Sequence, residues 1–87
     1  MAHVEVRDHA LWLKHIHGDE NLKKELESLP AGDLIELVVD GVKGTWKKMS
    51  DGRDGRPTMG IRGILSAKAH WHALQEQRGQ LVTIERA

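Results

Sequence analysis

The clearest alternation of hydrophobic and polar positions in the chain lies at residues 34–49. Two apolar runs flank the dipeptide Asp40-Gly41, which favours a type I′ turn because both central residues of that turn need a positive φ. A two-residue turn makes Ile35 and Trp46 cross-strand neighbours and gathers the apolar side chains of both runs on one face. The sequence therefore predicts a β-hairpin whose apolar face packs into the core.

Helical spacing of apolar residues predicts three helices, which we expect at 9–17, 19–29 and 66–78. Gly18 separates the first two, although one helix bent at this glycine is an alternative. Pro30 ends the second helix, because the proline ring disfavours the α conformation of the residue before it. The third helix is expected to cross over the apolar face of the hairpin.

The β-branched run at 80–86 predicts a last strand, which we expect beside residues 34–39. Residues 50–63 are rich in glycine and are expected to form a long loop, with a short third strand at 58–61 as an alternative. The predicted order is α-α-β-β-(loop or short β)-α-β. We expect a single α+β domain over 1–87, with a small, mostly antiparallel sheet and the helices packed on one face.

Composition limits what can fill the core of this domain. The 87 residues include no Phe and no Tyr, so Trp12, Trp46 and Trp71 supply most of the large apolar volume. We expect Trp46 and Trp71 in the core and leave Trp12 open between the core and an exposed patch. A domain of this size has little room to enclose a substrate.

The absence of cysteine removes disulfides, thiolate catalysis and thiol-ligated metals. No apolar run approaches the roughly 20 residues that a membrane span needs, and the N-terminal residues lack the apolar region of a signal peptide. We therefore expect a cytoplasmic protein without a membrane partner.

Charge is distributed unevenly along a chain whose net charge is zero. Residues 1–40 carry four basic and nine acidic side chains, whereas residues 41–62 carry six basic and two acidic ones. The basic side chains of the second segment are Lys43, Lys47, Lys48, Arg53, Arg56 and Arg62. Basic side chains near a glycine-rich loop can contact phosphates or carboxylates. The sequence therefore predicts a binding module for an anionic partner, either nucleic acid or an acidic protein surface.

Two alternatives explain the same charge pattern. Asp51 and Asp54 could neutralise the neighbouring arginines within a solvated loop. The acidic and basic halves could also meet between copies of the chain, which would make it a homo-oligomeric structural or interaction protein.

Six histidines raise the question of a metal site. His15 and His17, like His70 and His72, are two residues apart, and on a helix such pairs point in different directions. No H-E-x-x-H motif, nucleophile elbow or nucleotide-binding glycine pattern occurs. We expect no metal, cofactor or catalytic residue, and we keep a small metal-dependent or acid–base enzyme as the least favoured alternative.

Overall fold

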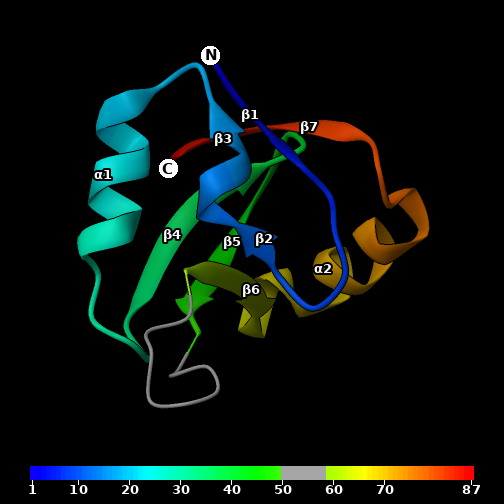
Figure 1. The fold of residues 1–87 in the computed structure, drawn as a ribbon. Coiled ribbons are helices and arrows are strands. Elements are labelled where there is room, and N and C mark those ends of the chain that lie inside the picture. The colour runs from blue at the N-terminus through cyan, green and yellow to red at the C-terminus, as the bar shows by residue number, and fades with distance from the viewer. Residues whose placement is uncertain (50–58) are drawn as a thin grey trace.

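The structure is a computed structural model that describes residues 1–49 and 59–87. Seven strands of these residues form one sheet in the order β2-β6-β5-β4-β7-β1-β3, and every neighbouring pair is antiparallel (Figure 1). The strands are β1 (Ala2–Glu5), β2 (Leu11–Trp12), β3 (Ile16–His17), β4 (Leu34–Val39), β5 (Val42–Lys48), β6 (Gly60–Ile64) and β7 (Leu81–Arg86). The helices are α1 (Glu20–Ser28) and α2 (Lys68–Leu74), with 3-10 turns η1 (Leu13–His15), η3 (Leu65–Ala67) and η4 (Gln75–Gln77).

The sheet curls into a nearly closed barrel because its two edge strands are neighbours in the sequence. β2 and β3 lie at opposite ends of the strand order, yet only the three residues of η1 separate them along the chain. A connection this short requires the two edges to approach each other. The right-handed twist of antiparallel strands supplies the curvature.

This architecture corrects the predicted fold class. The sheet is larger than expected and closes on itself, so the prediction of a small sheet with helices packed on one face is wrong. The predicted helix at 9–17 is instead β2, η1 and β3. Its apolar residues have helical spacing because η1 is a short helical turn, while the flanking residues pair with β6 and β1. Periodicity over so short a segment does not separate a helix from two strands joined by such a turn.

The N-terminal strand β1 was not predicted. Ala2 and Val4 are buried, whereas His3 between them is exposed. β1 pairs with β7 on one side and with β3 on the other. The period-two pattern of a half-buried strand was therefore present in the sequence.

The hairpin has the predicted register. Ile35 pairs with Trp46, and the turn residues Asp40 and Gly41 both have positive φ, 52° and 78°. β7 pairs with β4 at the edge opposite β5, as predicted, and the two strands are antiparallel. Most of the loop predicted at 50–63 lies outside the described residues, and its end is strand β6 (Gly60–Ile64), which overlaps the alternative short strand at 58–61.

The interior of the barrel is built around two tryptophans. Trp46 is fully buried and Trp71 is 5% exposed; their ring centroids lie 5.7 Å apart in an edge-to-face arrangement. Gly44 leaves room for η3, since a Cβ atom there would lie 2.6 Å from the Cβ of Ala67. Both core predictions for the tryptophans are confirmed, and Trp12 is half-buried.

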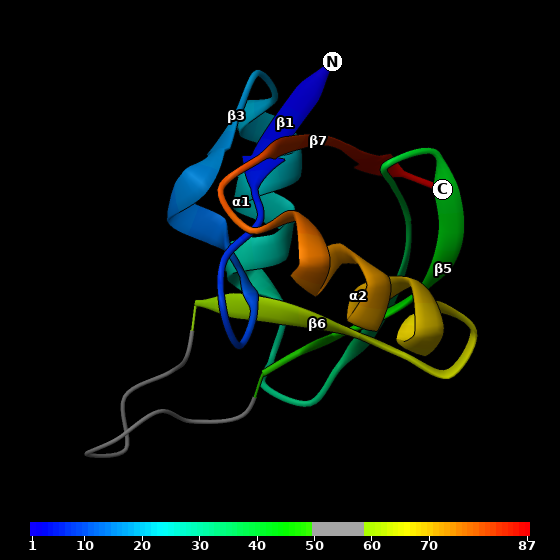
Figure 2. The same ribbon diagram turned by 90° about the vertical axis from the view of Figure 1, so that its right-hand side faces the viewer.

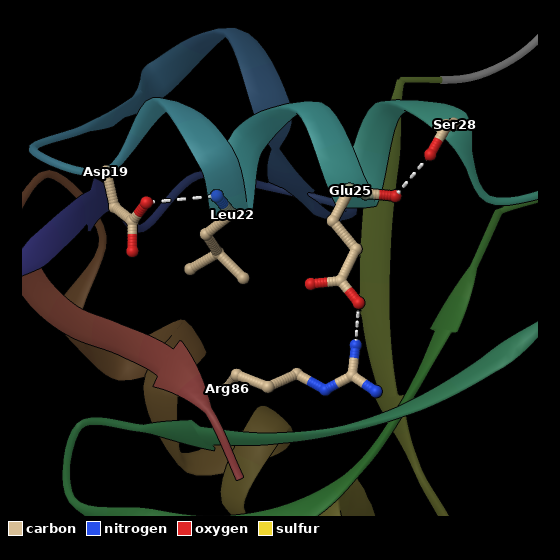
Figure 3. Close-up of polar contacts among 5 residues, drawn as sticks. All are labelled: Asp19, Leu22, Glu25, Ser28 and Arg86. Atoms are coloured by element: carbon tan, nitrogen blue, oxygen red, sulfur yellow. Dashed lines mark hydrogen bonds and ion pairs between the residues drawn. The ribbon is translucent and has the colours of Figure 1, made fainter.

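Helix α1 is capped at its beginning and joined to β7 by an ion pair (Figure 3). The Asp19 carboxylate accepts a hydrogen bond from the backbone N–H of Leu22 at 3.0 Å, which caps the first turn. Glu25 forms an ion pair with Arg86 at the end of β7. The helix thus follows the predicted stretch and buries Leu22 and Leu26 against the sheet.

Candidate functional site

A turn at His9 leaves part of one sheet edge open. β2 pairs with β6 at Gly60 and Ile61 and no further. Immediately before β2, the N–H of Ala10 donates to the carbonyl of Asp8 at 2.9 Å, and His9 between them has a φ of 72°. This is a γ-turn with positive φ, a rare and strained conformation. It directs the chain away from β6, so the part of β6 after Ile61 has no neighbouring strand on this side among residues 1–49 and 59–87.

The opening is a pocket of about 640 Å³, a volume within the range of ligand sites. Its walls are the edge of β6, the start of η3, the turn at His9 and one face of α2. Figure 2 shows α2 lying along β6. The residues that line it are His9, Arg62, Gly63, Ile64, Leu65, Lys68, Trp71, His72 and Gln75. The last four are spaced i, i+3, i+4 and i+7, so they share one side of α2 and η4.

The lining is basic. Arg62 and Lys68 contribute positive charge, and among the described residues no aspartate or glutamate lines the pocket. The Nε–H of Arg62 donates to the carbonyl oxygen of His9 at 2.7 Å, which fixes the guanidinium group between β6 and the γ-turn. Within residues 1–49 and 59–87, neither Arg62 nor Lys68 forms an ion pair.

Backbone strain is concentrated at the same place. Across the described ranges, the non-glycine residues with positive φ are His9, Asp40 and Leu65. Asp40 belongs to the hairpin turn, whereas His9 and Leu65 both line the pocket. A bulky residue such as Leu65 rarely adopts a φ of 48°. Such strain occurs preferentially at functional sites, which strengthens the case for this pocket.

The acidic residue next to the pocket is already engaged. The Asp8 carboxylate accepts a hydrogen bond from the Arg78 guanidinium at 2.6 Å, and this bond lowers the pKa of Asp8 and raises that of Arg78. Both side chains are exposed, so the pair adds little to stability. The hydrogen bond keeps the Asp8 carboxylate oriented toward Arg78.

We expect the Asp8–Arg78 pair to make a small, pH-dependent contribution. A carboxyl whose pKa is lower in the folded state adds stability above its unfolded pKa, and that stability is lost as the pH falls through the folded pKa. Asp8→Asn should therefore destabilise the protein slightly at about pH 7 and have no such effect at about pH 2. Urea unfolding at both pH values tests this. A loss of equal size at both would contradict it.

Of the six predicted partner-binding residues, the four that the structure describes lie in different surroundings. Arg62 lies in the pocket, and Lys47, its cross-strand partner, is exposed on the outer face of β5 with Lys43. Arg53 and Arg56 lie outside the described residues.

Lys48 stands apart from the rest of the predicted set because it is 2% exposed. Its ammonium group donates to the carbonyl oxygens of Leu26, Glu27 and Leu29 at 2.7, 3.1 and 3.1 Å. These carbonyls belong to the end of α1, where a helix lacks internal donors. Burial lowers the pKa of Lys48, and Glu27 opposes that effect. We leave Lys48 out of the candidate site because its donors are used inside the fold.

Sequence reasoning missed Lys68, His9 and His72 as members of this site. For Lys68 and His72 a signal existed, since they share a helical face with Trp71 and Gln75 and make that face partly polar. No comparable signal marked His9, because its place depends on where β2 stops pairing with β6.

Other kinds of site find less support in the described part of the chain. No three histidine, aspartate or glutamate side chains there are placed to hold a metal ion. None of its helices has the length and apolar character to cross a membrane. No family model, curated protein or solved structure matches the chain, so the pocket itself is the basis for a functional proposal.

Proposed function

We propose that this chain is a non-enzymatic binding module that holds an anionic group of its partner in the pocket between β6 and α2. The observation that carries the proposal is that both Arg62 and Lys68 line the pocket, while none of its described lining residues is a carboxylate. An anion placed there would gain charge-assisted hydrogen bonds from both side chains. Since the part of the lining that belongs to residues 1–49 and 59–87 has no hydroxyl or carboxylate side chain, it is better suited to binding than to nucleophilic or carboxylate chemistry.

The surroundings of the pocket favour an anionic partner larger than a single ion. Ile64 and Leu65 add apolar surface to the lining, and Leu65 is 70% exposed. Lys47 lies beside Arg62 on the outer face of the sheet and can extend the positive region toward β5. We expect the module to act in the cytoplasm, since a domain of this size without cysteine suits a reducing compartment.

Binding of labelled polyanions tests the proposal. The probes are a fluorescent poly-glutamate peptide, duplex DNA, single-stranded DNA and RNA, each titrated at low and at high salt. We expect at least one probe to bind at low salt and to be weakened by salt, because exposed charges are screened. Arg62→Gln and Lys68→Gln should each weaken that binding about tenfold.

Lys43→Gln is the matched control, because it removes the same charge from an exposed position that does not line the pocket. It should change the affinity by less than about threefold. Binding that all three variants weaken equally would place the contact outside the pocket. Failure of every probe to bind at low salt would refute the proposed function.

A further inference from the structure

The backbone of Gly63 points into the pocket. The carbonyl of Gly60 accepts from Met49 on the β5 side, and the carbonyl of Met59 accepts from Leu13 on the β2 side. Backbone groups of successive residues in a strand alternate between its two sides. Those of Ile61 and Gly63 therefore face the side of β2, and those of Arg62 face β5.

Gly63 has no strand to pair with on that side. β2 reaches only as far as Ile61, and the γ-turn at His9 has moved the chain away at the position where a longer β2 would meet Gly63. Within the described residues, the Gly63 N–H and C=O form no backbone hydrogen bond outside the regular strands. Gly63 is itself buried, because Ala67 and Trp71 pack against one face of it, and it lines the pocket together with Arg62 and Lys68. Its N–H and C=O groups therefore face the pocket and not open solvent.

We propose that the occupant of the pocket is an extended acidic segment of another protein, which adds to the open edge of β6 as a short strand. One residue of this segment exchanges two backbone hydrogen bonds with Gly63, as in an antiparallel pair. Its neighbouring Asp or Glu side chains bind Arg62 and Lys68. The inference rests on the proposed anion-binding function and names the class of partner.

The lining favours a peptide over nucleic acid. A phosphate group accepts hydrogen bonds but has no donor for the carbonyl of Gly63, whereas a peptide unit offers both groups. Trp71, the indole of the lining, is only 5% exposed, so the rings left for a base to stack on are the imidazoles of His9 and His72. A peptide backbone, by contrast, matches the donor and the acceptor of Gly63 at the same time.

A second copy of this chain fits the edge poorly. Symmetric pairing of two β6 edges would bring Arg62 and Lys68 of one copy close to the same residues of the other. Juxtaposed like charges oppose such a contact. An acidic partner instead complements the charge of the edge.

The test uses a blocked peptide of alternating glutamate and valine together with the isotopically labelled full chain. We expect the peptide to bind at low salt and to slow hydrogen exchange of the Gly63 amide about tenfold or more. Two further peptides carry N-methyl groups, one on its odd-numbered and the other on its even-numbered residues. Each peptide therefore lacks the backbone N–H donors that face one side of the extended chain. We expect one of them to lose about tenfold or more in affinity and the other to keep most of it. Glutarate serves as an anion without a peptide backbone.

The outcomes separate this inference from the proposed function. If the peptide binds but Gly63 exchange is unchanged and both N-methylated peptides bind equally, strand addition is wrong and anion binding stands. If single-stranded nucleic acid binds and the peptide does not, the partner class is wrong. A dimer in sedimentation that itself protects Gly63 would make a second copy the occupant. If neither the acidic peptide, nor glutarate, nor nucleic acid binds, both proposals fall.

Discussion

Replacing Trp46 by alanine is expected to lower the free energy of unfolding by about 3–5 kcal/mol. Trp46 is fully buried, and its ring packs against the edge or face of Trp71 at a centroid distance of 5.7 Å. Alanine would leave a large cavity at the centre of the barrel and remove the aromatic contact. Because a domain typically has only about 5–15 kcal/mol of stability, the variant should lose a large fraction of its free energy of unfolding. Urea denaturation followed by far-UV circular dichroism measures the loss.

Trp46→Phe is the informative companion variant. Among the described residues, the indole N–H of Trp46 is buried without a hydrogen-bond partner, a condition that costs about 1–3 kcal/mol. Phenylalanine removes that donor and keeps much of the ring, so we expect it to cost less than half of what alanine costs. A phenylalanine variant as unstable as the alanine variant would show that the indole N–H is satisfied.

Replacing Lys48 by methionine is expected to destabilise the protein by about 2–3 kcal/mol. Methionine has a similar length and suits a buried position, but it offers no donor to the three carbonyls at the end of α1. A buried acceptor left without its partner retains its desolvation cost. Hydrogen exchange should become faster in the last turn of α1, which distinguishes a loosened helix end from a general loss of stability.

Lys47→Met is the matched control for this variant. Lys47 precedes Lys48 on β5 but is exposed on the outer face, so its substitution should change stability by no more than about 0.5 kcal/mol. Equal losses from the two variants would contradict the assigned role of Lys48. If Lys48→Met were more stable than the original protein, the desolvation of the buried ammonium group would cost more free energy than its hydrogen bonds contribute.

The inward position of Lys48 could have been predicted from the sequence. The hairpin register that places Trp46 on the apolar face places Lys48, two residues further, on the same side of β5. A lysine on an inward-facing position needs acceptors. The prediction of Lys48 as a surface cation therefore contradicted the predicted register. In the structure Lys48 is buried, and carbonyl oxygens at the end of α1 accept its hydrogen bonds.

The sequence alone determined the elements whose signals are local. Asp40-Gly41 set the hairpin and its register, and Asp19 with Pro30 delimited α1, because turn and capping preferences depend on a few neighbouring residues. Alternation of polar and apolar residues was sufficient to place Trp46 inside. It was also present in β1, where the pattern could have been recognised.

Tertiary structure decided the closure of the sheet and the pocket. Residues 9–17 became two strands joined by η1 because their backbone found partners on β6 and β1, which are distant in sequence. The open edge at Gly63 exists because β2 stops at the γ-turn of His9. Arg62 on β6 and Lys68 on α2 line the same pocket because α2 lies along β6. Pairing partners and packing contacts between distant segments are not encoded by any short stretch of sequence, so the site emerges only when the chain has folded.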